Sequence, residues 1–305
     1  MLRATFISLS ESKSIRAAAE KTWIGQRLSR RFVAGNRVED ALAATQQMNK
    51  LGLGVSVDNL GENVTNAEEA RHSAQLYHQM LDRISAQGLQ ANVSLKLTHM
   101  GLDVDEKLAY DLAQGLVEHA ARIDNFVRID MEGSPYTQRT LDFVYRLHAQ
   151  PENAGHVGAV IQSYLFRSEK DVEQLIKKRI RVRLCKGAYK EPPEIAFEKK
   201  ADSDANYVKL MKMLLKSGVY HGIATHDENM IRATIDFAQK EKVPAAAFEF
   251  QMLHGVRRDL QLKLVKDGWR CRVYIPFGTE WYPYLMRRLA ERPANALFIL
   301  KNLFR

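Results

Sequence analysis

Polar and charged side chains recur where the short apolar runs of this sequence end. They are Asp58, Lys96, Asp130, Glu132, Gln162, Arg183, Lys186, Thr225, His226, Asp227, Glu249, Gln251 and Tyr274. A charge inside a strand costs free energy unless it is paired or functional. For any single one of these residues, a structural role in an internal ion pair is as good an explanation as a functional role. Because every run contributes at the same end, we interpret the set as a functional site.

The sequence KGAY at residues 186–189 is a candidate for binding a phosphate. Gly187 allows a tight turn whose backbone N–H groups can face an anion, and Lys186 adds a cation beside them. A glycine after a strand is usually only a turn. Arg183 and Lys96 contribute two further positive charges, and these strengthen the phosphate interpretation.

A divalent-metal site, as in barrel hydrolases and isomerases, is the alternative chemistry. Its candidate ligands are Asp130, Glu132, His226, Glu249 and His254, which are ligand types that suit divalent cations. No His-x-His follows the first apolar run, and nearby cations would weaken a metal site. We therefore expect no metal.

A nucleic-acid-binding scaffold is a third class, because the net charge is +9 and the isoelectric point is about 9.4. The arginines do not cluster with aromatic residues along one stripe, and no recognition module is readable. We expect no nucleic-acid partner.

Eight apolar, β-branched runs alternate with helical patterns. The runs cover residues 53–61, 92–101, 126–133, 157–165, 180–189, 219–227, 246–253 and 271–278. Helical patterns follow each run, including residues 66–87, 200–217, 228–240, 256–267 and 282–291. Two more precede the first run, near 12–31 and 38–50.

Eight strand-then-helix units predict right-handed crossovers and a parallel sheet. Closing the sheet gives an α/β protein with a distorted (β/α)₈ TIM-type barrel and extra N-terminal helices. An open doubly wound sheet is the runner-up, but no G-x-G-x-x-G follows any run. We expect residues 1–305 to form a single domain, with N-terminal helices in 1–51 and the barrel in 52–305. The strand-end residues then gather at one face.

Three helix starts carry recognisable signals. Asp103 and Glu106 have the spacing of a capping box. Ser134 and Pro135 fit an N-cap followed by a proline at the first helical position. Ser168 and Asp171 are expected to begin the helix after the fourth run.

The composition fits a soluble globular protein, with 46% hydrophobic and 27% charged residues. No apolar run approaches the roughly 20 residues needed to span a bilayer. The first residues lack the apolar core of a secretory signal. Cys185 and Cys271 lie in expected strands, so we predict buried free thiols in a reducing compartment. We expect the protein to be cytoplasmic.

Arg287 and Arg288 are adjacent in the expected last helix, within the sequence WYPYLMRRLAERP (281–293). Adjacent helix residues point about 100° apart. Tyr284 precedes them by three and four residues and so lies on the strip between them. We interpret the pair as a clamp for an anion; a solvated helix edge is the alternative.

The strand-end segments, in this order, resemble those of monofunctional bacterial proline dehydrogenases. The segments are SLKLT (94–98), RIDME (128–132), QSYL (162–165), VRLCKGAY (182–189), ATHD (224–227), FEFQMLHG (248–255), YIPFG (274–278) and YLMRRLAER (284–292). The resemblance runs from about residue 30 to the C-terminus. It implies a flavoenzyme that oxidises L-proline to Δ1-pyrroline-5-carboxylate by hydride transfer to N5 of a non-covalently bound FAD.

The resemblance also implies roles for individual residues. The expected FAD contacts are Met131, Gln162, Arg183, Lys186, Gly187, Ala188, Thr225 and His226. The expected proline contacts are Lys96, Tyr189, Leu253, Tyr274, Tyr284, Arg287 and Arg288. Asp130 and Arg183 would be catalytic, with Arg183 beside the flavin N5 and Asp130 orienting the basic residues.

Electrons would pass to a quinone, and a separate pyrroline-5-carboxylate dehydrogenase would act next. The basic segment 12–32 suits peripheral contact with the inner face of the cytoplasmic membrane. Packing of this segment on the barrel is the favoured interpretation.

Overall fold

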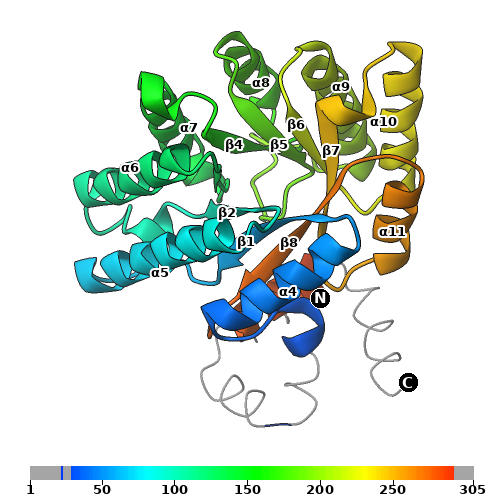
Figure 1. The fold of residues 1–305 in the computed structure, drawn as a ribbon. Helices are drawn as coiled ribbons and strands as arrows, with labels where there is room; N and C mark the ends of the chain where they lie inside the picture. Colours follow the sequence, from blue (N-terminus) through cyan, green and yellow to red (C-terminus); the bar gives the residue numbers. More distant parts are fainter. Residues whose placement is uncertain (1–21, 23–28, 292–305) are drawn as a thin grey trace.

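The eight strands close into a barrel in chain order, and all neighbouring strands are parallel. The computed structural model describes residue 22 and residues 29–291, with side chains described up to residue 286. Closure comes from the pairing of the first and last strands, in which Gly54 to Asn59 lie opposite Arg272 to Phe277. Helices surround the barrel (Figure 1). The predicted (β/α)₈ barrel is confirmed, and the open sheet is wrong.

The strands are short. They are β1 (Gly54–Asn59), β2 (Ala91–Leu95), β3 (Val127–Ile129), β4 (Val157–Gln162), β5 (Arg181–Cys185), β6 (His221–Ala224), β7 (Phe248–Leu253) and β8 (Cys271–Phe277). All but β2 lie within their predicted ranges, and β2 begins one residue early. Most end before the apolar runs do, because the last residues of each run leave the sheet and form the βα loops. One of these loops contains a 3₁₀ turn, η1 (Thr98–Met100).

Helices follow every strand. They are α5 (Ala67–Ala86), α6 (Glu106–Arg122), α7 (Ser134–His148), α8 (Ser168–Lys177), α9 (Lys200–Lys216), α10 (Glu228–Lys240), α11 (Arg258–Lys266) and α12 (Trp281–Glu291). Helix α4 (Val38–Lys50) precedes the barrel, as predicted, and most of the helix expected near 12–31 lies outside the described residues. Two short 3₁₀ turns, η2 (Pro151–Asn153) and η3 (Ala245–Ala247), precede β4 and β7. Within residues 29–291, every helix is too short or too polar to cross a lipid bilayer.

Two of the predicted helix starts are displaced. Helix α6 is capped by Asp105, whose carboxylate accepts hydrogen bonds from the backbone N–H groups of Lys107 and Leu108 at 2.8 and 3.2 Å. Asp103 instead accepts a hydrogen bond from Tyr136 at 2.7 Å. Gly133 is the N-cap of α7, so Ser134 is already helical. Capping spacings are ambiguous when several acidic residues are close in sequence, and tertiary contacts decide among them.

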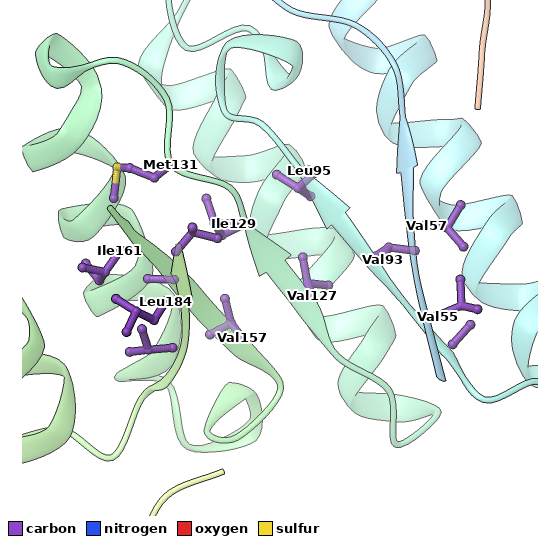
Figure 2. Packing of buried hydrophobic residues seen from close by; sticks show 14 of the residues in the cluster. Val55, Val57, Val93, Leu95, Val127, Ile129, Met131, Val157, Ile161 and Leu184 are labelled. Carbon is purple, nitrogen blue, oxygen red and sulfur yellow. The ribbon is translucent and has the colours of Figure 1, made fainter. Parts of the chain in front are cut away.

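The two faces of the barrel wall differ in chemistry. The outer face is apolar and packs on the helices; Val55, Val57, Val93, Leu95, Val127 and Ile129 belong to this layer (Figure 2). The alternate residues point inward, because side chains alternate along a strand. Ser56 of β1 shows this directly, since its hydroxyl accepts a hydrogen bond from Arg183 of β5 at 3.4 Å. The inner face is therefore polar, unlike the branched apolar filling common in such barrels.

Helix α12 is fixed by a second, smaller apolar cluster. Its members are Phe32, Val33, Leu60, Trp281, Tyr282, Tyr284 and Leu285. The cluster joins the segment before α4, the loop after β1 and the last helix. It anchors the first half of α12 beside the carboxyl end of β1, where a substrate site would lie in a barrel.

Candidate active site

Arg183 and Asp130 form the central ion pair of the barrel interior. The guanidinium Nη1 lies 2.7 Å from Asp130 Oδ1, and both residues are buried. The same carboxylate accepts hydrogen bonds from the Ser94 and Tyr274 hydroxyls, both at 2.8 Å. Asp130 therefore holds donors from β2, β5 and β8 in one arrangement.

A second contact fixes the other edge of the Arg183 guanidinium. Its Nε donates to Gln251 Oε1 at 2.5 Å, and Gln251 in turn donates to Glu249 Oε1 at 2.6 Å. The ring of Tyr274 lies 5.1 Å from the guanidinium carbon. Arg183 is thus held on several sides by neutral and anionic partners, and its position is pre-organised.

The partly buried Lys96 and the buried Asp58 form a second ion pair on the same face, with 3.2 Å between Nζ and Oδ2. Burial lowers the pKa of the Lys96 ammonium, but Asp58, Glu62 and Asp130 outweigh it and hold that pKa above its ordinary value. Burial raises the pKa of Asp58, and Lys96 opposes that rise. Lys96 remains a cation, with donors left for an anionic ligand.

Glu132 lies beyond the end of β3 and is bound to Thr98. The Thr98 hydroxyl donates to one carboxylate oxygen at 2.6 Å, and the Thr98 N–H donates to the other at 3.2 Å. Burial raises the pKa of this carboxyl to about 6, against the opposing hydrogen bonds. Gln162 donates to the backbone carbonyl of Glu132 at 3.1 Å, and the neighbouring Met131 is buried.

Lys186 lies between two carboxylates, at 2.6 Å from Asp204 and 2.8 Å from Asp227. Its ammonium has three N–H donors, so one remains for another acceptor. Next to it, Gly187 has φ +120°, and a Cβ there would lie 1.8 Å from a ring carbon of Tyr164. Only glycine fits this turn, and Gly187 itself is exposed.

The end of β6 and the end of β7 are tied together by His226. Its Nε2 accepts a hydrogen bond from the Leu253 N–H at 2.9 Å. The buried Thr225 hydroxyl accepts one from the Asp227 N–H at 3.0 Å. Leu253 pairs with Tyr274 in the β7–β8 register, so these residues share one side of the mouth.

The remaining candidates lie in the loops and in α12. Tyr189 is half-buried, and Gly133 approaches its ring, since a Cβ on that glycine would lie 4.0 Å from Cδ1. Ala188 lies between Gly187 and Tyr189 in the same loop. Tyr284 belongs to the apolar cluster of α12. Positions 287 and 288 continue the α12 backbone, but their side chains lie outside the described part.

The five candidate metal ligands are not brought together. Glu249 is the second residue of β7, lies toward the opposite end of the barrel, and pairs with Arg272 at 2.7 Å. Asp130, Glu132 and His226 each have the other partners described above. No three His, Cys, Asp or Glu residues of the described chain form a group that could hold a metal ion.

The two cysteines are thiols that form no disulfide in the described part of the chain, as predicted, but they differ in environment. Cys271 is buried, and burial raises the pKa of its thiol to about 12. Cys185 is only half-buried, because it ends β5 at the open mouth. The expectation of burial is therefore wrong for Cys185.

Several contacts were not proposed as part of the site from the sequence. Ser94 stands two residues before Lys96. That spacing puts both side chains on the same face of the strand, and it was the signal that could have identified Ser94 as a site residue. Gln251 was seen at its strand end, but its bond to Arg183 depends on the barrel register. Asp204 lies in α9, and nothing in the sequence marks it as a partner of Lys186.

A closed (β/α)₈ barrel with fixed cations at the carboxyl ends of its strands defines a barrel enzyme that binds an anionic substrate or cofactor at that face. The family model described as proline dehydrogenase matches residues 41–301. The chain belongs to the proline dehydrogenase family.

Named relatives agree with this assignment along the whole chain. Proline dehydrogenase 1 of Bacillus subtilis is 40% identical over 306 residues, covering all of both chains. Proline dehydrogenase of Deinococcus radiodurans is 36% identical over 309 residues, covering 100% of this chain and 98% of the other. The crystal structure of proline utilization A from Bdellovibrio bacteriovorus, inactivated by N-propargylglycine, matches with a TM-score of 0.84 at 27% identity. That match covers 92% of this chain and 34% of the longer protein. The metal-dependent hydrolase or isomerase alternative is therefore wrong.

Proposed function

We propose that this chain oxidises L-proline to Δ1-pyrroline-5-carboxylate with a non-covalently bound FAD, as the first step of proline degradation. The observation that carries the proposal is the buried Arg183–Asp130 pair at the strand ends of a chain from the proline dehydrogenase family. When bound, FAD would supply the two-electron acceptor, since this chemistry belongs to the cofactor and not to side chains.

The residues of this face fit a flavin dinucleotide. Gly187 is exposed and has the positive φ of a tight turn whose backbone can face a diphosphate, and Lys186 has one donor to spare. We assign Lys186, Gly187 and Ala188 to the diphosphate, and Thr225 and His226 to the ribityl–adenosine part. Arg183, Gln162 and Met131 are assigned to the isoalloxazine ring.

The substrate carboxylate is assigned to Lys96, Arg287 and Arg288. Lys96 is supported by its raised pKa, which keeps it charged beside Asp58. The side chains of Tyr189, Leu253, Tyr274 and Tyr284 are assigned to the walls around the pyrrolidine ring of proline. Tyr274 is fixed for this by its hydrogen bond to Asp130.

The chain contributes position and charge. Cations at the carboxylate orient the proline ring, which reduces the entropy lost on reaching the reactive geometry. The same cations favour the neutral form of the proline amine, because a nearby positive charge lowers the pKa of an ammonium. Arg183, held rigid by Asp130 and Gln251, places a fixed positive charge where negative charge develops during oxidation.

We further propose that a quinone takes the electrons, and that a separate pyrroline-5-carboxylate dehydrogenase consumes the product. A cytoplasmic protein with peripheral contact at the inner face of the membrane would meet a membrane quinone. We also propose that residues 1–305 act as one domain, because one continuous apolar core runs from Val38 to Phe277.

Colour tests the proposal directly. The purified protein is expected to be yellow and to bleach anaerobically when L-proline is added. Added quinone should restore the colour. A colourless protein whose activity depends on an added divalent metal would overturn the proposal.

A further inference from the structure

We propose that a cavity at the N-terminal face of the barrel, opposite the proposed flavin site, binds a small molecule that carries phosphate groups. The cavity has a volume of about 470 Å³, and four of its lining residues are arginines. They are Arg179, Arg181, Arg270 and Arg272. Tyr220 supplies the aromatic part of the lining.

The parallel strands bring these arginines together. Arg181 and Arg272 are the first residue of β5 and the second of β8, and Arg179 and Arg270 lie in the loops just before those strands. All strands start at one face of the barrel, so their first residues converge there. The cavity is wide open to solvent, and its volume lies within the range of about 300–1,000 Å³ typical of small-molecule sites.

Glu249 is the one carboxylate that forms an ion pair with this group of arginines within the described residues. It is already bound to Arg272 at 2.7 Å and accepts a hydrogen bond from the Tyr220 hydroxyl at 2.9 Å. Within the same part of the chain, Arg179, Arg181 and Arg270 form no ion pair with a carboxylate. The Nε of Arg181 is buried and has no hydrogen-bond partner in the structure. The arginines thus outnumber the carboxylates around the cavity.

A further arginine lies behind the cavity wall. Arg128 is buried, and its Nη1 donates to the backbone carbonyls of Arg181 at 2.6 Å and Ala159 at 3.0 Å. Burial lowers the pKa of Arg128, and Arg183 and Arg181 lower it further. Burial and Arg128 likewise lower the pKa of His221 to about 3. Burial is the main cause of both shifts, and the neighbouring arginines add a smaller part, which a bound anion would offset.

The geometry favours phosphate over a single carboxylate. A guanidinium offers a planar fork of donors that matches oxyanions. Several guanidinium groups without a carboxylate partner favour a ligand with several negative charges. A phosphate monoester carries a charge of about −1.5 to −2 at neutral pH. The Tyr220 ring lies 4.9 Å from the Arg181 guanidinium and 5.8 Å from that of Arg270, so it can contact an apolar part of the ligand.

Arg179 allows an unusually clean test. It has φ +57° at the position just after the C-cap of α8, where glycine is favoured. The equivalent positions after α5, α9 and α11 hold Gly88, Gly218 and Gly268. Arg179→Gly therefore removes the guanidinium and relieves backbone strain together. Lys242, with φ +55° after α10, gives the matched control: Lys242→Gly makes the same change outside the cavity.

The experiment is calorimetric titration of the FAD-loaded protein with inorganic pyrophosphate at low ionic strength, with citrate as the carboxylate arm. We expect saturable pyrophosphate binding and weaker citrate binding. Arg179→Gly and Arg270→Gln should each raise the Kd roughly ten- to a hundredfold, because each removes a charged hydrogen-bond donor. Lys242→Gly should leave the Kd unchanged.

Four outcomes overturn the proposal. They are the absence of pyrophosphate binding, equal affinity for citrate, equal losses in Lys242→Gly, and loss of binding in Lys186→Gln on the opposite face. Binding of phosphatidylglycerol vesicles through the same arginines, without pyrophosphate binding, would make the face a membrane contact and also overturn it. Proline oxidation should be unchanged in Arg179→Gly, and pyrophosphate binding is measured without proline, so failure of this proposal and failure of the proposed function are distinguishable.

Discussion

The Arg183 guanidinium and the Asp130 carboxylate lie 2.7 Å apart inside the barrel. The exposed fraction is 6% for Arg183 and 8% for Asp130. A buried pair of this kind is costly to break, because the remaining charge loses its partner. Ser94, Tyr274 and Gln251 complete the hydrogen bonding around the pair. The pair is therefore a rigid unit, and changes to it should affect position as well as charge.

Arg183→Lys keeps the positive charge but removes the fork that reaches Asp130 and Gln251 together. We expect weaker flavin retention and a flavin reduction rate lowered roughly ten- to a hundredfold, which corresponds to the loss of one charged hydrogen bond. Flavin content and anaerobic single-turnover reduction by L-proline measure both effects. Arg139→Lys is the matched control, because Arg139 is more exposed and pairs at the surface with Asp103 and Glu106. Parent-like behaviour of Arg183→Lys would remove this residue from the flavin site.

Gly187→Ala tests the turn at the proposed diphosphate site. The added Cβ would meet the Tyr164 ring at 1.8 Å, and φ +120° is unfavourable for any side chain. We expect the loop to shift and the protein to be purified with little FAD, while the barrel stays folded by circular dichroism. Gly88→Ala is the control, since Gly88 also has positive φ but has open space around it. Normal FAD content in Gly187→Ala would contradict the assignment.

Strand order and the face of the site were predictable, because both follow from the alternation of strands with helices along the sequence and from the parallel pairing of the strands. The position of a residue along its strand was harder to predict. Glu249 was taken as a strand-end residue, yet it is the second residue of β7 and bonds to Arg272 at the opposite face. A shift of two residues moves a side chain by about 6–7 Å along a strand, which decides which mouth it faces.

Partners from distant elements were not predictable from one sequence. Asp204 reaches Lys186 from α9, and Tyr77 reaches Asp58 from α5 with 3.2 Å between the oxygens. Both contacts depend on how each helix packs against the barrel. Local sequence patterns predict where a helix forms, but they do not predict how the helix is rotated about its axis when it packs on the barrel.

Glu132 should make the stability depend on pH. The folded protein holds its pKa at about 6, above the ordinary value of 4.5, so the folded state binds more protons between these values. Stability therefore falls as pH rises from about 4.5 to about 6, by about 2 kcal/mol at 1.36 kcal/mol per unit. Glu132→Gln lacks this titration. The difference in unfolding free energy, variant minus parent, should increase by about 2 kcal/mol between pH 4.5 and 7.5.

Urea denaturation at both pH values measures that difference, and hydrogen bonds lost at both pH values cancel from it. Glu152→Gln, at an exposed glutamate, should give the same difference at both. A Glu132→Gln difference that does not change with pH would show that the buried carboxyl titrates as it does in the unfolded chain.

The arginine pair of α12 provides the test of the substrate pocket. The backbone is helical through residue 291, and Tyr284 is 7% exposed. Positions 287 and 288 follow Tyr284 by three and four residues, so they flank the strip of helix that Tyr284 turns toward the protein. A helix edge directed wholly to solvent would not place a buried tyrosine on that strip. We therefore predict that both arginines bind the proline carboxylate.

Arg287→Lys and Arg288→Lys keep the charge and lose the bidentate fork. Losing one charged hydrogen bond costs about 1.5–3 kcal/mol, so kcat/KM for proline should fall roughly ten- to a hundredfold. Methionine at either position should cost more, because the charge is lost as well. FAD content should stay normal, since the pair serves the substrate. Arg232→Lys, at an exposed arginine of α10, is the control and should match the parent. If all four arginine-pair variants oxidise proline as the parent does, the pair is a solvated edge and the carboxylate binds elsewhere.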